Sequence, residues 1–220
     1  MIGNEIDLLK NYPKTKRDLS KRLETKSPEH RKIARQFGKD FFDGTRDTGY
    51  GGFHYHERFW KPVVPDLQEH FDLSASSSLL DVGCAKGFML VDLKKNIPGI
   101  KLSGVDISEY AVQTSHPDVK ETISLASCDD LPFEDNSFDV VISITTIHNL
   151  DYDGCVRSLR EIERVAKQKS FITVDAYRDD DERKRMEAWN LTAKTILHVD
   201  AWKDMFVEAG YTGDYFWFMP

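Results

Sequence analysis

Two aspartates that each close a short apolar run are the residues with the clearest potential for chemistry. Asp81 ends the first run, and Asp106 ends a second run, 101–106, 25 residues further along the chain. Such runs predict buried parallel strands, and in a right-handed strand–helix–strand unit both strands end at the same edge of the sheet. A carboxylate there can accept hydrogen bonds from both hydroxyls of a vicinal diol, each worth about 1.5–3 kcal/mol. The alternative for Asp106 is a helix N-cap, a role that Ser108 suits better.

The segment after the first aspartate has small residues at alternate positions. Gly83, Ala85 and Gly87 give the spacing D-x-G-x-A-x-G, and a helix-like apolar stretch follows over 88–93. Small side chains let backbone N–H groups approach a ligand closely. The spacing differs from the G-x-G-x-x-G of dinucleotide-binding turns. It therefore predicts a strand–turn–helix unit that holds a different ligand.

A third polar group lies further along the chain. Ser127, Cys128 and Asp129 precede Leu-Pro-Phe at 131–133, and a predicted strand over 138–144 is followed by Thr145 and His148. Taken in order, the three groups resemble the motifs of class I S-adenosylmethionine (SAM)-dependent methyltransferases. The Leu-Pro-Phe motif, with Asp-Asn-Ser-Phe-Asp after it, is similar to the quinone-biosynthesis type of small-molecule methyltransferase.

The likeness extends beyond these motifs. The stretches 46–52, 147–150, 175–178 and 210–215 resemble a bacterial methyltransferase subfamily of polysaccharide and secondary-metabolite pathways. The resemblance implies an α/β fold, a Rossmann-like doubly wound and mostly parallel sheet of six or seven strands with an N-terminal helical extension. It also implies SAM as the cofactor. The expected cofactor residues are Tyr50, Asp81, Gly83, Cys84, Ala85, Lys86, Gly87, Asp106, Ile107, Ser127, Cys128, Asp129 and Thr145.

The adenine contact departs from the family pattern. An acid usually stands six residues before the Phe of the Leu-Pro-Phe motif and holds the adenine amino group, and here that position is Ser127. The contact falls either to Asp129 or to the Ser127 hydroxyl and the backbone around Cys128.

Methyl transfer needs little acid–base chemistry, because the leaving thioether is neutral. A base is required only when the acceptor is a hydroxyl or a protonated amine. His148, at the end of the fourth predicted strand, is the expected catalytic base, or else a wall of the pocket. We expect a small-molecule acceptor, a polar metabolite with a hydroxyl on a sugar-like or nucleotide-linked compound. The expected acceptor-binding residues are His54, Tyr55, Arg58, Tyr177, Arg178 and Trp189.

Composition narrows the classes of protein. Residues 1–46 carry a balance of +5 and the remainder −12, which argues against a nucleic-acid substrate. No apolar run reaches the roughly 18 residues of a membrane span. Three cysteines without a C-x-x-C pair predict a reducing, cytoplasmic setting, and no metal site is expected from His54, His56 and His148. A homodimer, a nucleic-acid methyltransferase and a non-catalytic SAM-binding protein remain open alternatives.

The chain divides into two expected regions. Residues 1–60 form a helical extension and cofactor lid, with Ser27 and Pro28 starting a helix and glycines over 44–53 giving the lid its freedom. Residues 61–220 form the methyltransferase domain. In that domain we expect helices over 57–71, 156–167, 179–195 and 201–209, and strands over 171–175 and 215–219.

Overall fold

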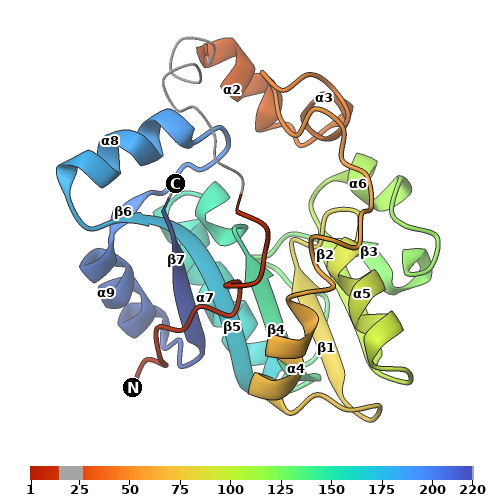
Figure 1. Cartoon of the computed structure of the whole chain (residues 1–220). Coiled ribbons are helices and arrows are strands. Elements are labelled where there is room, and N and C mark those ends of the chain that lie inside the picture. Colours follow the sequence, from red (N-terminus) through yellow and green to blue (C-terminus); the bar gives the residue numbers. More distant parts are fainter. Residues whose placement is uncertain (15–26, 220) are drawn as a thin grey trace.

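A twisted parallel sheet forms the centre of the computed structural model, which describes residues 1–14 and 27–219 (Figure 1). The strand order is β3-β2-β1-β4-β5-β7. The short β6 pairs with Ala176 and Tyr177, the last residues of β5, which follow the residues of β5 that pair with β7. Every pairing between these strands is parallel, and the seven strands confirm the Rossmann-like fold expected from the sequence. The strands are β1 (Ser78–Val82), β2 (Lys101–Asp106), β3 (Ile123–Leu125), β4 (Phe138–Ile144), β5 (Ala166–Tyr177), β6 (Leu197–His198) and β7 (Asp214–Phe218).

Helices cover both faces of the sheet, because side chains alternate between two hydrophobic clusters. Leu80 of β1 and Ile172 of β5 pack with α7 and α9, whereas Leu79 and Phe171 pack with α4 and α5. This alternation is typical of a strand buried on both faces. The helices of the domain are α4 (Val64–Phe71), α5 (Phe88–Asn96), α6 (Glu109–Gln113), α7 (Tyr152–Val165), α8 (Asp180–Trp189) and α9 (Val199–Ala209), with 3₁₀ turns η1 (Lys120–Thr122) and η2 (Ile147–Asn149).

Several element boundaries differ from the expectations. The helix expected over 57–71 begins only at Val64, because Pro62 has no amide hydrogen and disfavours the helical conformation at Lys61, whereas Pro65 is accepted in the first helical turn. The helix expected to run to Thr195 ends at Trp189. The side chain of Asn190 donates to the Ala193 carbonyl and accepts the Ala193 amide, so the chain makes a turn there instead. Residues 156–167 were expected to be helical, but the helix is Tyr152–Val165, which starts at the Asp151 N-cap.

The first 14 residues were expected to be helical, but the structure shows no helix there. Residues 1–14 form turns and an isolated bridge, in which Ile6 N–H donates to Tyr215 O and Tyr215 N–H donates to Asn4 O. This segment therefore covers the outer edge of β7, where an unpaired strand would otherwise expose its backbone groups. Figure 1 shows it running along the front of the sheet toward the α2–α3 layer.

A separate layer, residues 28–60, lies over the carboxyl edge of the sheet (Figure 1). It contains α2 (Pro28–Ala34), which starts at the expected Ser27 cap, and α3 (Lys39–Phe42). On the α5–α6 side, Asp43 accepts hydrogen bonds from Lys86 Nζ at 2.6 Å, Tyr110 OH at 2.7 Å and the Phe53 amide at 3.0 Å. This layer, called the lid below, is therefore tied to the glycine-rich turn that carries Lys86.

The other side of the lid is tied to the α8 region. Arg35 donates to the carbonyl oxygens of Thr192 and Ala193, and Arg31 donates to Glu187 O. The lid thus bridges the two halves of the sheet edge and encloses the space between them.

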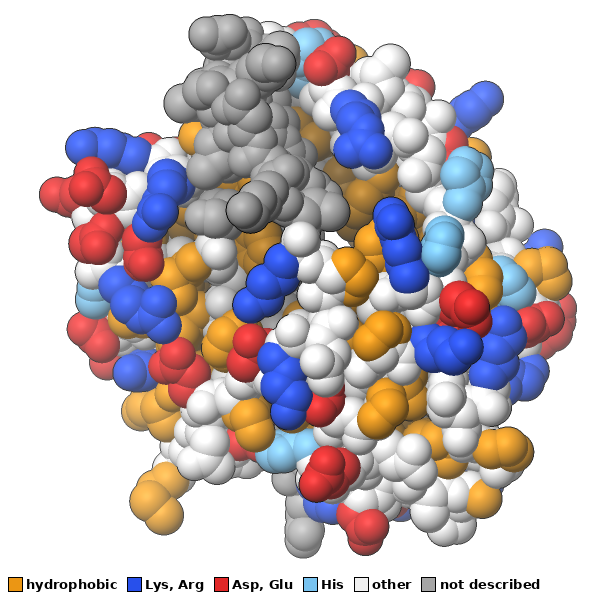
Figure 2. All heavy atoms as spheres, in the orientation of Figure 1, with side chains coloured by type: hydrophobic (Ala, Val, Ile, Leu, Met, Phe, Trp, Pro, Cys, Tyr) orange, Lys and Arg blue, Asp and Glu red, His pale blue; other side chains and the backbone are white. Residues whose placement is uncertain are grey.

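The surface has no single-sign charged face in the view of Figure 2, where Lys/Arg and Asp/Glu side chains are interspersed. Over residues 1–14 and 27–219, no helix combines the length and the apolar character that a membrane span requires.

The Asp43 contacts predict how firmly the lid is held. Burial alone would raise the pKa of Asp43, but hydrogen bonds from Lys86, Phe53 and Tyr110 outweigh it and lower the pKa to about 2. The tether is therefore fully present above the ordinary carboxyl pKa and is lost only as pH falls toward about 2. In Asp43→Asn the buried Lys86 ammonium loses its counter-charge, a loss that costs about 3 kcal/mol. We expect hydrogen exchange of residues 44–60 to accelerate about 100-fold while β1 amides stay protected.

Asp40→Asn is the matched control, since Asp40 is exposed on α3 and has no ion pair among the described residues. Equal exchange rates over 44–60 in the two variants would contradict the tether.

Candidate active site

A cavity of about 930 Å³ lies at the carboxyl edge of β1, β2, β4 and β5, beneath the lid. Ligand pockets usually measure about 300–1,000 Å³, so this one has room for two small molecules side by side. Its walls combine strand ends with lid aromatics such as Phe37, Phe42 and Phe53.

The glycine-rich turn forms one wall. Gly83, Ala85 and Gly87 all have positive φ, at 84°, 50° and 76°. A Cβ on Gly83 would meet Thr146 at 2.1 Å, and one on Gly87 would meet Ile123 at 2.5 Å. The two glycines therefore serve the backbone conformation and close packing within the protein, rather than the ligand approach expected from the sequence.

Asp106 orders this turn from the end of β2. One carboxylate oxygen accepts the Ala85 amide at 2.7 Å and the other accepts the Ser108 amide at 2.8 Å. Burial raises the pKa of Asp106, and these two backbone hydrogen bonds oppose that shift. Each oxygen keeps a second lone pair, so a diol in the cavity could still donate to this carboxylate. The expected N-cap role belongs to Ser108, whose hydroxyl accepts the Ala111 amide.

Asp81 is an orphaned acid on the same wall. It is 5% exposed, and among the described residues none donates a hydrogen bond to its side chain. Burial, with a smaller contribution from the Asp106 charge, raises its pKa to about 8. A buried carboxyl without a partner is costly to ionise, so a cationic ligand group beside it would be strongly favoured.

Ser127 and Asp129, the two residues expected as alternatives for the adenine contact, lie in different places relative to the cavity. Ser127 lines the cavity, whereas Asp129 lies behind it, accepts a hydrogen bond from the Ser127 hydroxyl and pairs with Arg157 at 2.8 Å. The Ser127 proton is thus used by Asp129, and the Ser127 oxygen presents acceptor lone pairs to the cavity.

Most of the expected cofactor residues meet in this cavity, and three do not. Lys86 turns away to Asp43, Gly87 caps α5, and Asp129 stands behind Ser127. The residues that line the cavity are Tyr50, Asp81, Gly83, Cys84, Ala85, Asp106, Ile107, Ser127, Cys128 and Thr145.

The expected acceptor-binding residues are largely elsewhere. Trp189 lines the cavity, but Tyr55 donates to Asp92 on α5 at 2.7 Å, and Arg178 pairs with Glu5 at 3.2 Å. His54, Arg58 and Tyr177 are likewise absent from its lining. Arg58 instead lies over the Phe59 ring, and Tyr177 packs against His198.

Residues outside the expected set line the cavity in which the acceptor-binding side chains were expected. Tyr12 comes from the N-terminal segment, for which the sequence predicted a helix, so its position had no local signal. The sequence pattern could have identified two of them. Thr146 is adjacent to the expected Thr145, and Asn190 lies in the insertion before β6. The cavity-lining residues outside the expected set include Tyr12, Arg35, Phe37, Arg46, Trp60, Thr146, Asn190 and Lys194.

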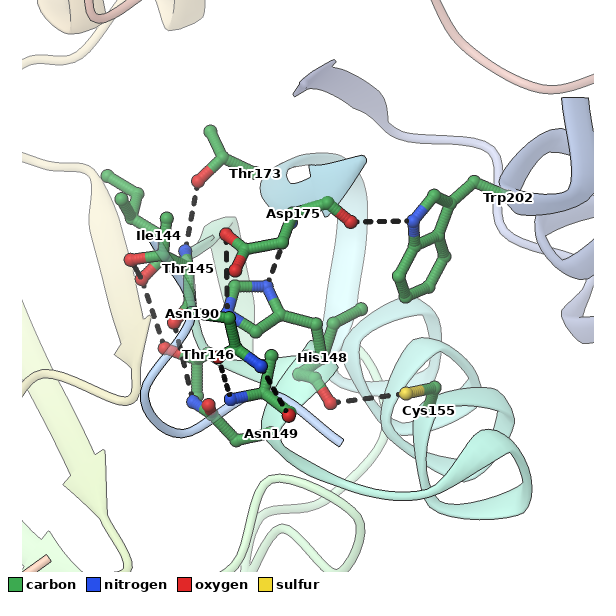
Figure 3. Close-up of polar contacts among 12 residues, drawn as sticks. Ile144, Thr145, Thr146, His148, Asn149, Cys155, Thr173, Asp175, Asn190 and Trp202 are labelled. Atoms are coloured by element: carbon green, nitrogen blue, oxygen red, sulfur yellow. Dashed lines mark hydrogen bonds and ion pairs between the residues drawn. The ribbon is translucent and has the colours of Figure 1, made fainter. Parts of the chain in front are cut away.

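His148 and Asp175 lie together at the ends of β4 and β5 (Figure 3). The Asp175 amide donates to His148 Nδ1 at 3.0 Å, and His148 Nε2 lies 3.7 Å from Asp175 Oδ1. Both residues line the cavity while being only 3% and 6% exposed. Burial lowers the pKa of His148, and the Asp175 charge opposes that shift, so the ring is neutral near pH 7. No cluster of metal-ligating side chains occurs among the described residues.

The backbone at the end of β4 is strained. Thr145 has a φ of 51°, an outlying value for a β-branched residue, and its amide donates to Thr173 O at 3.0 Å. Such conformations cost about 1–3 kcal/mol and persist where the surrounding structure imposes them. Here the strain turns the chain from β4 into η2 and brings His148 back over β5 (Figure 3).

Comparison with known proteins connects this cavity to an established domain family. Residues 80–174 match the model of a family described as a methyltransferase domain. A sterol 4-C-methyltransferase of Caenorhabditis elegans is 31% identical over 156 residues, which cover 66% of this chain and 43% of that protein. A demethylmenaquinone methyltransferase of Symbiobacterium thermophilum is 35% identical over 118 residues, which cover 50% of this chain and 45% of that protein. The chain thus spans about half the length of the curated relatives it matches.

The fold has solved counterparts. The YcgJ protein of a Bacillus species superimposes with a TM-score of 0.55 at 18% identity, covering 66% of each chain, which shows a shared fold. The family match coincides with the strands that carry Asp81, Asp106 and the turn between them. Over residues 80–174, the segment that forms the core of the sheet and one wall of the cavity, the chain is therefore similar to a methyltransferase domain.

Proposed function

We propose that this chain is a SAM-dependent methyltransferase that methylates a hydroxyl group of a small polar metabolite. The observation that carries the proposal is the cavity itself, in which two buried acids at the ends of β1 and β2 line one part and room for a second molecule remains. The family match supports SAM as the cofactor. SAM supplies an electrophilic methyl group on a sulfonium, together with an ammonium, a ribose diol and an adenine.

In the part of the cavity lined by the two buried acids, individual residues suit individual groups of SAM. Asp81, which has no hydrogen-bonding partner among the described residues, would hold a positive charge of the methionine end. Asp106, fixed by Ala85 and Ser108, would accept the ribose hydroxyls. Ser127, whose own proton is used by Asp129, would accept the adenine amino group. The protein then contributes mainly position and exclusion of water, which can lower a barrier by about 7–11 kcal/mol in favourable cases.

The second part of the cavity supports a small acceptor. Trp60 and Trp189 offer aromatic faces, and Arg46 and Lys194 offer positive charge. Among the described residues neither cation has a carboxylate within ion-pair distance, so a carboxylate or phosphate of the acceptor would be their natural counter-ion. A sugar-like or nucleotide-linked compound has this combination of hydroxyls, a face for stacking and an anionic group.

The alternatives fit less well. A nucleic-acid methyltransferase would need a basic approach surface, whereas the chain carries −7 overall and its charges are mixed in Figure 2. A non-catalytic SAM-binding protein would not need the room left beside the cofactor residues. We also propose that residues 1–60 act as one unit that closes the cavity, and that the three buried free thiols reflect a reducing, cytoplasmic setting.

The first prediction from the proposed function concerns the cofactor. Purified protein should bind SAM and its demethylated product in calorimetry, and Asp106→Asn should weaken both by about 10- to 100-fold. The asparagine removes the charge from hydrogen bonds worth about 1.5–3 kcal/mol. Glu109→Ala is the control, because this nearby carboxylate is exposed on α6 and does not line the cavity. Absence of binding at millimolar concentration in the unaltered protein would refute the cofactor assignment.

The second concerns the reaction. With methyl-labelled SAM, we expect label in an ether product from a panel of nucleoside diphosphate sugars, sugar phosphates and hydroxybenzoates. The Arg46→Met variant should raise KM for the anionic members at least tenfold while leaving SAM affinity unchanged, because a unit charge contact is lost. Arg185→Met, remote from the cavity lining, is the matched control. Transfer to amines or thiols alone would contradict O-methylation.

A further inference from the structure

The cavity contains a third buried acid that has no role in holding the cofactor. We propose that Asp175 is the catalytic base that takes the proton of the acceptor hydroxyl, and that His148 is a positioning residue that orients Asp175. The proposal rests on the proposed function, because it assigns the proton of an O-methylation.

The Asp175 carboxylate is unpartnered. Its side chain is 8% exposed and lines the cavity, and among the described residues no group donates a hydrogen bond to either oxygen. The nearest polar atom is His148 Nε2 at 3.7 Å, which is an ion-pair distance but too long for a hydrogen bond. Because the carboxylate lines the cavity without a donor from the described residues, a ligand in the cavity can supply that donor. A hydroxyl is such a donor.

The main chain of Asp175 is held from both sides, which fixes the backbone position from which the carboxylate projects. Its amide donates to His148 Nδ1 at 3.0 Å, and its carbonyl accepts the indole N–H of Trp202 at 3.0 Å (Figure 3). His148 is itself anchored, since its carbonyl accepts the amides of Lys194 and Thr195 at 3.0 Å each. A base held in this way loses little freedom when the acceptor binds.

The same contacts argue against His148 as the proton acceptor. A backbone N–H can only donate, so the bond from Asp175 places the lone pair of the neutral ring at Nδ1 and its proton at Nε2. The Nδ1 lone pair is occupied, and Nε2 already carries a proton. The Nε2–H instead points its positive end toward the Asp175 carboxylate, where it favours the ionised form.

The surroundings suit a carboxylate base. Burial raises the pKa of Asp175, and the neighbouring His148 ring opposes that shift. Two further neighbours carry no titratable group: Phe218 is the register partner on β7, and Trp202 is the contact from α9. From the segment before β6, Lys194 is the charged residue that lines the same cavity. A carboxylate made more basic by burial accepts a proton more readily in the transition state than an exposed one.

The step balances without a further reagent. The acceptor oxygen forms its bond to the methyl carbon as the sulfur–methyl bond breaks, and that electron pair stays on sulfur. The hydroxyl proton passes to Asp175, so the sulfonium charge and the carboxylate charge are lost together. Neutral amines and thiolates need no such base, and their transfer would leave Asp175 without a task.

A test without any ligand comes first. In cofactor-free protein, nitrogen NMR of His148 should show the Nε2–H tautomer at neutral pH, and carbon NMR should show Asp175 titrating above the ordinary aspartate range. Asp175→Asn assigns the carboxyl signal, and Asp200→Asn, an exposed control on α9, should change neither resonance. An Nδ1–H tautomer, or an Asp175 that ionises in the ordinary range, overturns the proposal whatever the acceptor is.

A kinetic test follows with the panel compound that turns over fastest. Asp175→Asn should lose at least 100-fold in kcat at unchanged SAM affinity and melting temperature, as expected when a general base is removed. His148→Gln, which keeps a donor, should stay within tenfold of the parent. His148→Phe should shift the acidic limb of the rate profile to higher pH, since the carboxylate loses a group that stabilises its charge.

The opposite pattern, with His148→Phe inactive and Asp175→Asn active, would make the histidine the base and overturn the proposal. If no compound of the panel is methylated although SAM binds, the proposed O-methylation is at fault, and the two NMR titrations alone decide on Asp175.

Discussion

Asp81, Asp106 and Asp175 stand at the carboxyl ends of three strands, and each is less than a tenth exposed. Withdrawing carboxyl groups from water into one cavity is costly, and burial raises the pKa of all three. Parallel strands make the arrangement unavoidable once each strand ends in an acid, because their carboxyl ends share one edge. The structure offsets the cost for only one of them, Asp106, which receives two backbone amides. The other two have no hydrogen-bond donor among the described residues, and we have proposed Asp81 for the cofactor part and Asp175 for the acceptor part of the cavity.

The lid belongs to the same electrostatic arrangement. Lys86, within the glycine-rich turn, could have neutralised a cavity acid, but it turns outward and pairs with Asp43 of the lid. The turn is therefore attached to the lid by a buried ion pair, while Asp81 keeps no internal counter-charge. Because removing either partner of a buried pair leaves an uncompensated charge, the lid and the turn stabilise each other. The lid is anchored at both the Lys86 side and the α8 side, which supports the proposal that it closes the cavity.

Most residues expected to bind the cofactor line the cavity, whereas most residues expected to bind the acceptor do not, for a physical reason. Asp81, Asp106 and Ser127 follow apolar runs, so the local pattern alone determines which edge of the sheet they occupy. The positions of Tyr55 and Arg178 depend on neighbours far along the chain, Asp92 on α5 and Glu5 at the N-terminus, and no local pattern reports such contacts. His148 was correctly placed at the end of β4. Its protonation pattern depends on an amide of β5, which only the folded structure reveals.

The division of the cavity also coincides with the limits of the family match. Residues 80–174 contain Asp81, Asp106 and Ser127, whereas Asp175 follows directly after the matched segment. The other walls of the acceptor part come from the N-terminal segment, the lid and the insertion before β6, through Tyr12, Trp60 and Trp189. A sterol and a quinone methyltransferase can therefore share the matched segment with this chain while accepting different molecules. Most walls of the proposed acceptor part thus come from elements outside the matched segment, and the proposed base Asp175 is the first residue after that segment.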